Sequence, residues 1–445
     1  MNFDELKQVL KAEAFALGIE EYEIYYTSSN AVSTETLEDE ISSFSGGNGA
    51  GVSFRCIVDG RMGNAATELF EVEELKLLVR RARDNASVIE SDTPAIIFGG
   101  SERYADLEGQ DFSMPSTAYL KDLALCMQRN TYAQNELVTD GTQSGVFAQI
   151  SRYELANSKG LRLSNSVFCG GAFVQAVVNR DGEAQEDFDF CIGFDGTQEL
   201  SKKAVDGAMS KLGACDVQTG KYKIVIDGKQ MRSILSAYSS VFSGKNALLG
   251  LSLLAGKEGD KIASDCVTLV DDPMPDGSTV ATPFDGEGVA TYKKNVIENG
   301  VLNTLLYDLA HAMKAGKQTT ANGQRGSYAQ QVSIAPFCFY IKAGELSDDE
   351  LLKKMGDGIY ITELKGLHAG ANAVTGDFSI ESAGFLVQNG KKIKAVKGFT
   401  VAGNFFDMLK NIEAVSSQVK FGIPSGFTVY GSPDVLLGEM SVAGV

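Results

Sequence analysis

The residues most able to do metal or acid–base chemistry in this chain are its two histidines. His311 lies in a short helical pattern that begins at Asp308, and His368 precedes a turn-rich segment. Neither has a second ligand two, three or four positions away in a known metal-binding pattern. We therefore interpret His311 as a packed or surface residue, and His368 as a loop residue near a binding site.

Three aspartates stand in segments where a carboxylate could act: Asp271, Asp272 and Asp377. The first two directly precede Pro273, a pattern that favours a turn over a catalytic pair. Asp377 follows a glycine and is expected to hold its own loop through backbone hydrogen bonds. No G-x-S-x-G motif is present, so a serine hydrolase would have to combine a serine with one of the two histidines. That alternative stays open.

Residues 243–246, Ser-Gly-Lys-Asn, partly match a phosphate-binding loop. The complete motif needs a glycine and a final serine or threonine where the chain has Ser239 and Asn246. This segment therefore indicates the end of a helix.

Residues 366–408 carry the densest set of local structural signals in the chain. Short polar side chains and a glycine predict a sharp, irregular loop of the kind that lines a site, at Asn372, Gly376, Asp377, Phe378 and Ser379. The dipeptide Asn389-Gly390 between two apolar runs predicts a hairpin with a type I′ turn. A strand around 399–401 and a helix over 405–412 are expected to follow.

The order of these motifs resembles the TldD/PmbA family, and specifically its PmbA (TldE) branch. The matching patterns are N-x-x-x-G-D-F-S at 372–379 and A-G-N-x-x-D-M-L at 402–409. Residues 249–273 also resemble the family's G-x-S-x-x-x-G-x-x-G segment with its following strand and aspartate pair. The C-terminal residues 430–433 and 442–444 fit the family's ending. The resemblance covers nearly the whole chain.

In the TldD branch of this family, a helix carries H-E-x-x-x-H, in which two histidines bind zinc and the glutamate is the general base. Zinc held in this way acidifies a bound water, and the carboxylate takes up its proton. The resemblance places these positions at Leu235, Ser236 and Ser240, where Leu235 and Ser240 replace the histidines. No histidine occurs between 225 and 265, and no cysteine after Cys338 can supply the family's third ligand. We therefore expect no metal, no other cofactor, and no peptidase activity from this chain alone.

The resemblance implies one subunit of a two-chain metallopeptidase system that acts on unfolded or extended peptides. Its partner would be a zinc-bearing TldD-type chain in a heterodimer, and a homodimer could also form. A peptide-binding cleft is expected opposite the helix 229–242, lined by Asn372, Gly376, Asp377, Phe378, Ser379 and His368. The alternatives are an autonomous non-zinc hydrolase using serine or aspartate, and a non-enzymatic binding protein such as a modulator of DNA gyrase.

The composition is that of a globular protein with an acidic surface. The 445 residues include 58 acidic and 40 basic side chains, a net charge of −18 that disfavours direct binding to nucleic acid. No apolar run is long enough for a membrane span, and the N-terminus lacks a secretory core, so a cytoplasmic location is expected. Seven scattered cysteines without a C-x-x-C pair are interpreted as buried, reduced thiols.

The first half of the chain combines helical patterns with a meander of alternating strands. A boundary is expected in the turn-forming stretch 213–220, which gives an N-terminal domain over 1–213 and a C-terminal domain over 220–445. Residues 91–115 lack periodicity and are expected to form a long exposed loop. Helices are predicted at 3–17, 72–86, after Ser116 and at 200–212, and strands at 22–26, 31–37, 39–45, 51–58, 145–156 and 161–178.

The second half begins with a strand at 222–226, an Asp-Gly turn and the helix 229–242, and then becomes mostly β. Residues 298–300 predict a hairpin turn, and residues 347–350 a capping box for a short helix. Because strands and helices do not alternate regularly, we predict an α+β fold. It has N-terminal helices with an antiparallel sheet, and a C-terminal β-rich domain of mixed and antiparallel strands with few helices.

Overall fold

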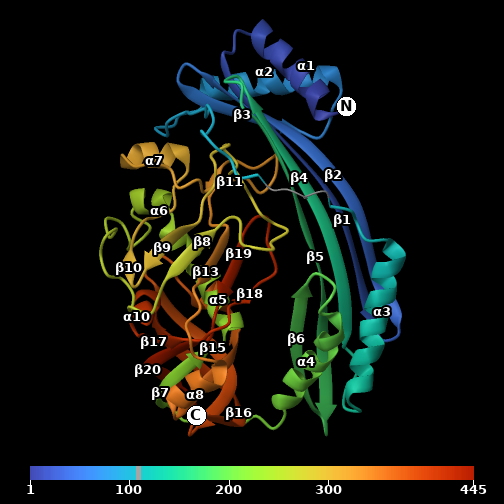
Figure 1. Cartoon of the computed structure of the whole chain (residues 1–445), viewed down its shortest axis with the longest axis vertical. Helices are drawn as coiled ribbons and strands as arrows, with labels where there is room; N and C mark the ends of the chain where they lie inside the picture. Colours follow the sequence, from blue (N-terminus) through green and yellow to red (C-terminus); the bar gives the residue numbers. More distant parts are fainter. Residues whose placement is uncertain (107–111) are drawn as a thin grey trace.

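The structure, a computed structural model, describes residues 1–106 and 112–445. A tall, curved sheet forms one side of the elongated molecule, and the C-terminal half packs beside it (Figure 1). All neighbouring strands of this sheet are antiparallel, in the order β3-β2-β1-β4-β5-β6. They are β1 (Glu21–Leu37), β2 (Glu40–Val58), β3 (Arg61–Thr67), β4 (Gln143–Asn157), β5 (Arg162–Arg180) and β6 (Glu183–Ile192).

Four helices cover the two ends of this sheet. At one end, α1 (Phe3–Ala16) and α2 (Val72–Val88) bury leucines such as Leu6 and Leu75 against β1 and β2. At the other end, α3 (Thr117–Gln134) and α4 (Thr197–Ser210) pack on β4 and β5. Ser116 caps α3 by accepting a hydrogen bond from the backbone N–H of Tyr119, as its position predicted.

The strands β1 and β2 are longer than the sequence predicted. The four expected strands at 22–26, 31–37, 39–45 and 51–58 form two continuous ones. The polar middle of β2 pairs with β1 alone, because β3 reaches only residues 52–58. The polar middle of β1 stays in the ladder because both of its neighbours are strands: Asn30 lies opposite Asn48 on one side and Ile150 on the other. Backbone pairing on both edges thus replaces the apolar pattern that usually marks a strand.

Two further expectations for this half were incomplete. Strand β6 was not predicted, although its second half alternates acidic and aromatic residues, from Asp187 to Phe190. The stretch 91–115 contains neither helix nor strand in its described part, but it is not fully exposed: Ile97 is buried, and the Tyr104 hydroxyl donates a hydrogen bond to the Gly288 carbonyl at 2.8 Å. Residues 107–111 of this expected loop lie outside the described residues.

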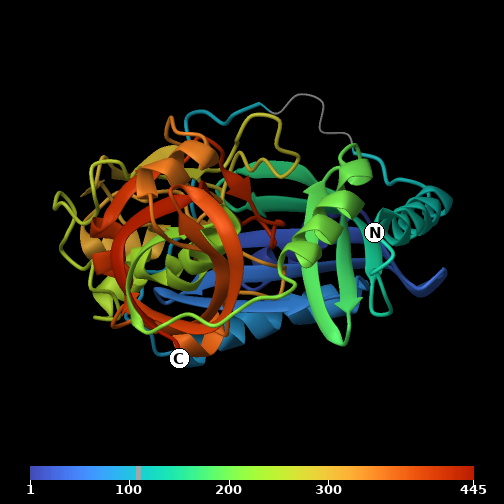
Figure 2. The ribbon, with the colours of Figure 1, turned by 90° about the horizontal axis from the view of Figure 1, so that it is seen from below.

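The C-terminal half is built around a closed β-barrel, seen end-on in Figure 2. The strand order is β16-β15-β14-β7-β20-β17, and an additional pairing between β16 and β20 closes the ring. Apolar residues of the helix α5 (Gly228–Tyr238) join the core of this half. The strands are β7 (Gly220–Ile226), β14 (Gly358–Lys365), β15 (Asp377–Gln388), β16 (Lys391–Asn404), β17 (Ile412–Val415) and β20 (Val435–Ala443).

A second sheet of this half has the order β10-β9-β8-β13-β19-β18 and contains one parallel pair, β13 with β19. Its strands are β8 (Leu269–Asp272), β9 (Lys294–Glu298), β10 (Val301–Leu302), β13 (Cys338–Ile341), β18 (Lys420–Phe421) and β19 (Val429–Ser432), and β11 (Gly323–Gln324) pairs separately with β12 (Ser333–Ile334). The short helices are η1 (Ser239–Phe242), α6 (Gly244–Leu248), α7 (Leu309–Ala315), α8 (Asp348–Met355), α9 (Leu367–Gly370) and α10 (Phe405–Lys410).

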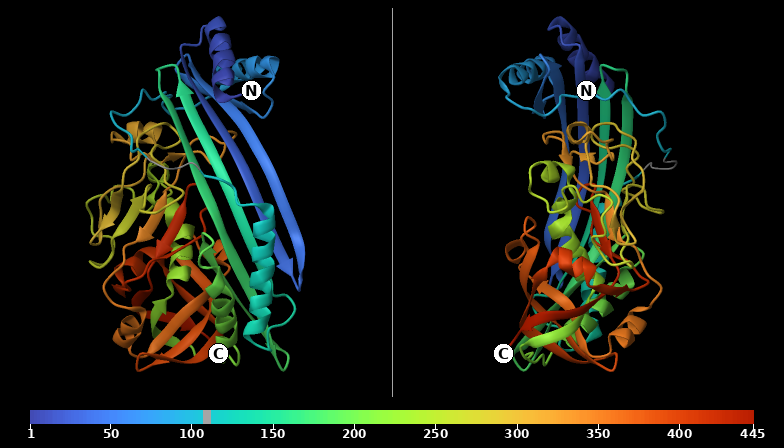
Figure 3. Two further views of the ribbon diagram at one scale, coloured as in Figure 1. Left: turned by 45° about the vertical axis from the view of Figure 1, so that its right-hand side comes forward. Right: turned by 90° about the vertical axis from the view of Figure 1, so that its left-hand side faces the viewer.

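These elements confirm the predicted α+β fold, with helices and an antiparallel sheet in the N-terminal half and a β-rich C-terminal half (Figure 3). The expected turn between β15 and β16 is present, with φ of +49° at Asn389 and +73° at Gly390. All seven cysteines are free thiols, but only Cys56 and Cys338 are buried as expected; three others are half-buried, and Cys126 and Cys266 are exposed. None of the helices among the described residues is long and apolar enough to span a membrane. The boundary at 213–220 stays a prediction.

Candidate functional site

The helix α5 carries the positions where the family's metal ligands would stand. It begins after Asp227, whose carboxylate caps it by accepting a hydrogen bond from the Lys229 backbone N–H at 2.7 Å. Leu235 is fully buried in the apolar core of the C-terminal half. Ser236 and, in the following turn η1, Ser240 are exposed. The first ligand position therefore contributes to packing and presents no polar group.

The predicted irregular loop is present over residues 372–376. The Asn372 side-chain oxygen accepts hydrogen bonds from two following backbone N–H groups, at 2.9 and 3.3 Å, which closes a tight turn. Gly376 has φ of +85°, and a Cβ there would lie 2.7 Å from the Phe406 ring. Only glycine fits this position without displacing that ring.

Asp377, Phe378 and Ser379 were expected to continue this loop, and that expectation is wrong. They begin strand β15, where Asp377 lies opposite Asn404 of β16. The Asp377 carboxylate accepts a hydrogen bond from the Asn404 side-chain amide at 2.9 Å, and this bond, with one from Thr375, lowers its pKa. Asp377 was expected to hold its own loop through backbone hydrogen bonds, but its carboxylate instead binds a side chain of the neighbouring strand β16.

This segment lies against α5, the helix that it was expected to face. The Tyr238 hydroxyl donates a hydrogen bond to the Asp377 carbonyl at 2.8 Å, and burial raises the pKa of Tyr238 to about 12. His368 is exposed and lies in α9, not in a loop. The three cavities between the N-terminal sheet and the C-terminal half are lined by other residues. The peptide-binding role of residues 372–379 and His368 stays a prediction.

The second histidine, His311, lies in α7 far from His368 in sequence. Its Nδ1 atom is 2.8 Å from the Asp308 carboxylate, which also caps the helix by accepting from the His311 backbone N–H at 2.7 Å. Within residues 1–106 and 112–445, no three His, Cys, Asp or Glu side chains gather as metal ligands would. The residues at the family's motif positions do not fit a zinc ion.

The pair Asp271-Asp272 does not form the predicted turn but ends the buried strand β8. The Asp271 carboxylate accepts hydrogen bonds from Lys294 Nζ at 3.0 Å, from the Asn322 amide at 2.8 Å and from the backbone N–H of Phe337 at 2.7 Å. A fully buried carboxylate with these partners holds strands and loops together. It is structural.

One cluster of ionisable groups was missed by the sequence analysis. The Tyr360 hydroxyl oxygen lies 2.6 Å from the Asp227 carboxylate and 3.0 Å from that of Asp434, so its single proton lies between two acceptors. Lys420 Nζ lies 2.9 and 2.5 Å from the same two carboxylates. Burial opposes the charge on Lys420, but the two carboxylates outweigh it and raise its pKa. Only the Asp227 helix cap has a sequence signal, because the other members come from strands distant along the chain.

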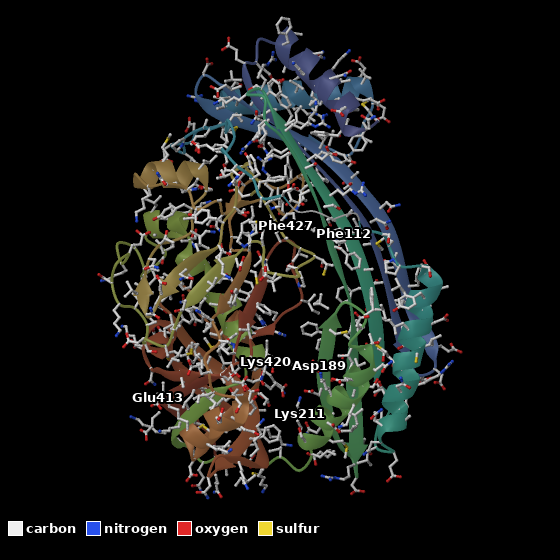
Figure 4. The ribbon with its side chains drawn as sticks, viewed as in Figure 1. Phe112, Asp189, Lys211, Glu413, Lys420 and Phe427 are labelled. Carbon is white, nitrogen blue, oxygen red and sulfur yellow. The ribbon has the colours of Figure 1, made fainter. Side chains whose placement is uncertain are left out.

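This cluster lies at the junction of the two halves. Figure 4 shows Lys420 on the side of the C-terminal half turned toward Asp189 of β6. Asp189 accepts a hydrogen bond from Lys229, in the first turn of α5, at 2.8 Å. The backbone N–H of Gly228 donates to Asp434 at 2.8 Å. The start of α5 is thus fixed to the barrel and to the N-terminal sheet by charged groups.

Known proteins match both halves of this chain. A family model described as the PmbA/TldA metallopeptidase C-terminal domain matches residues 219–444, and the model of domain 1 of the same family matches residues 22–86. An uncharacterized protein of Methanocaldococcus jannaschii is 28% identical over 92% of this chain and 94% of its own length. The metalloprotease PmbA of Escherichia coli O157:H7 is 29% identical over 60% of this chain and 57% of its own length.

Solved structures match along the full length. A Thermotoga maritima protein described as a candidate modulator of a DNA gyrase is 28% identical, with a TM-score of 0.89 over 99% of this chain and all of its own. TldE from Thermococcus kodakarensis, 21% identical with a TM-score of 0.86 over 99% of this chain and all of its own, shares the fold. The family model that covers the C-terminal half, together with the motifs at 372–379 and 402–409, shows that this chain belongs to the PmbA/TldD family of metallopeptidases.

Proposed function

We propose that this chain is the metal-free subunit of a two-chain peptidase acting on extended peptides, in which a zinc-bearing TldD-type partner supplies the catalytic metal. The observation that carries this proposal is the state of the motif helix: Leu235 is buried in the core, and Ser236 and Ser240 present only hydroxyl groups. A catalytic zinc site needs three nitrogen, oxygen or sulfur ligands, usually histidines and a carboxylate or thiolate. An independent zinc peptidase is therefore not compatible with this helix.

The fold nevertheless matches a solved structure over 99% of this chain, and the family model of the C-terminal domain matches residues 219–444, which include the helix. The segment 372–376 forms a tight turn, and Tyr238 links α5 to the start of β15. In a chain without the metal ligands, this framework would serve a role other than holding a catalytic zinc ion. Pairing with a related subunit provides one, because two homologous chains can form a pseudo-symmetric dimer with one active site.

An exposed apolar surface follows the motif directly and supports such pairing. We define the leucine surface as Leu248, Leu249, Leu251 and Leu253, which are 46%, 60%, 46% and 56% exposed. Four exposed leucines within six residues are unusual for an acidic protein and are typical of a protein–protein contact. The neighbouring buried residue Leu254 anchors the segment in the core.

The leucine surface lies close to the degenerate motif. The Asn246 side-chain amide in α6 donates a hydrogen bond to the Ser240 carbonyl at 2.9 Å, and the Ser252 hydroxyl donates to the Val241 carbonyl. A partner that covers these leucines would therefore lie beside the helix end where the family's second histidine would stand. This arrangement favours the subunit over an autonomous non-zinc hydrolase.

The test is reconstitution of the purified chain with a TldD-type relative. We expect no stoichiometric zinc by elemental analysis of this chain, no cleavage of an unstructured peptide by it alone, and cleavage by the mixture that a chelator abolishes. About one zinc per chain with chelator-sensitive activity of the chain alone would contradict the proposal. If the relative alone is as active as the mixture and the two do not co-elute, the chain is not a subunit, and binding to DNA gyrase becomes the next function to assay.

A further inference from the structure

A polar cavity of about 260 Å³ lies between the two halves of the molecule, apart from the motif helix. On the N-terminal side it is lined by β2, β3 and residues 89–96, and on the C-terminal side by α6, α7 and residues 325–332. Figure 1 shows α6 and α7 near the end of the molecule that carries β3. Any ligand in this cavity would touch both halves.

Basic side chains dominate the lining. Arg55 and Arg61 come from the N-terminal sheet, and Lys245 and Arg325 from the C-terminal half. Arg55 and Arg325 are only 9% and 4% exposed, so their charges are taken out of water. Buried guanidinium groups require anionic partners, because desolvating an unpaired charge costs several kcal/mol.

Few groups accept hydrogen bonds from these two arginines, although the buried carboxyl groups of Asp285 and Glu287 lie close enough to interact with them electrostatically. A single carboxylate, Glu23, serves both: Arg55 Nη2 donates to it at 3.1 Å, and Arg325 Nη2 donates to its other oxygen. Arg55 Nε is 2.8 Å from Glu23 but lacks the alignment of a hydrogen bond. The buried Nε of Arg325 has no hydrogen-bond partner among the residues that the structure describes.

The two carboxylates of the lining are engaged elsewhere. Asp308 caps α7 and contacts His311 Nδ1 at 2.8 Å. Glu287 accepts from the Leu309 backbone N–H at 2.8 Å and lies 3.9 Å from Arg55, beyond a hydrogen bond. Burial, with the neighbouring Asp285, raises the pKa of Glu287 to about 8. The four basic side chains of the lining outnumber its two carboxyl groups, in a protein of net charge −18.

We propose that this cavity is a binding site for a small oxyanion, held by Arg55, Arg61, Lys245 and Arg325. Guanidinium groups present paired N–H donors that match the oxygens of both carboxylate and phosphate. Two sources share this chemistry: free phosphate, and the C-terminal carboxylate of a short peptide. Because the basic groups come from both halves, the bound oxyanion ties the N-terminal sheet to the C-terminal half.

The experiment measures binding to the full chain by calorimetry and by the rise in melting temperature. The probes are inorganic phosphate, an N-acetylated dipeptide with a free carboxylate, and the same dipeptide as its amide. The test variant is R61Q/K245Q, which changes two exposed residues. It leaves intact the Glu23 cluster, which we define as Glu23 with Arg55 and Arg325. The matched control is R81Q/K202Q, which removes the same charges from exposed positions outside the cavity.

We expect phosphate or the free-carboxylate dipeptide to bind, and the amide not to bind. Affinity should fall roughly tenfold or more in R61Q/K245Q, because charged hydrogen bonds are lost, and stay unchanged in the control. Binding of phosphate alone would assign a free-anion site, and binding of the dipeptide alone would assign a site for peptide termini. Absence of binding by both, or binding that R61Q/K245Q leaves unchanged, would overturn the proposal. None of these results depends on the reconstitution of peptidase activity.

Discussion

The hydroxyl of Tyr238 donates a hydrogen bond to the backbone carbonyl of Asp377 at 2.8 Å, joining two residues 139 positions apart. The Tyr238 ring also stacks on Phe405, with centroids 4.4 Å apart and planes 4° from parallel. One side chain thus connects the helix of the degenerate metal motif, the start of β15 and the start of α10. Packing and hydrogen bonds of this side chain therefore connect the elements around the motif.

Replacing Tyr238 separates these contributions. Tyr238→Phe keeps the stacked ring and removes one buried hydrogen bond, so we expect a loss of about 1 kcal/mol in the free energy of unfolding. Tyr238→Ala also removes the buried ring and should cost roughly 3–5 kcal/mol. Urea unfolding followed by circular dichroism measures both. As a control, Tyr222→Phe removes an exposed bond to the Gln218 carbonyl and should change stability less. Equal effects of the two Phe variants would show that the Asp377 contact contributes nothing.

Turns and helix caps of the C-terminal half were predicted from the sequence, because each depends on residues close together in the chain. Asn389-Gly390 fixed the β15–β16 turn, because both residues adopt positive φ there. Ser347 was predicted as a helix cap with Glu350, and both hydrogen bonds of the capping box are present. The Asn404 side chain caps α10 at the position where the helix was expected to start. Each feature depends on residues only a few positions apart.

Features that depend on distant residues were not predictable from one sequence. The length of β1 depends on pairing with both β2 and β4, so its polar centre around Asn30 carried no strand signal. The cluster of Tyr360, Asp227 and Lys420 joins residues up to 193 positions apart. Glu23 meets Arg325 across 302 positions. Burial of a charge has no local pattern, because it is decided by which elements pack together.

The Glu23 cluster should contribute strongly to stability. Glu23→Ala leaves Arg55 and Arg325 buried without their shared carboxylate, so we expect a loss of roughly 3–5 kcal/mol. The measurement is guanidinium unfolding at constant pH. The control Glu73→Ala breaks an exposed pair with Lys76 on α2 and should leave the midpoint nearly unchanged. A similar midpoint for both variants would mean that the arginines relax into solvent when Glu23 is removed.

Stability should fall as the pH rises through about 8. Burial raises the pKa of Glu287 to about 8, against about 4.3 for an unfolded glutamate. The neighbouring carboxylates of Asp285 and Asp308 act in the same direction, and Arg55 and the Leu309 N–H oppose them. The folded state therefore binds this proton more tightly, so its stabilising effect is complete below about pH 4.3 and lost as pH rises through 8.

Unfolding free energies measured between pH 6 and 9 test this expectation. The wild-type curve should decline, and Glu287→Gln, which stays neutral, should decline less. The control Glu345→Gln alters an exposed residue and should keep the wild-type slope. If the slopes of wild type and Glu287→Gln coincide, another group controls the alkaline limit. Asp285, whose pKa is raised to about 6 by burial, would act at lower pH.

The leucine surface should control association without supporting the fold. Leu249→Asp and Leu253→Asp place a charge at positions 60% and 56% exposed, so the free energy of unfolding should change by less than about 0.5 kcal/mol. Co-elution with a TldD-type relative, and any self-association seen by sedimentation, should be lost because the charge would be buried unpaired in the contact. The matched control is Leu69→Asp, which alters a leucine 53% exposed in the N-terminal half. If Leu249→Asp and Leu253→Asp pair as tightly as Leu69→Asp, the partner does not cover this surface, and the exposed leucines need a different explanation from subunit contact.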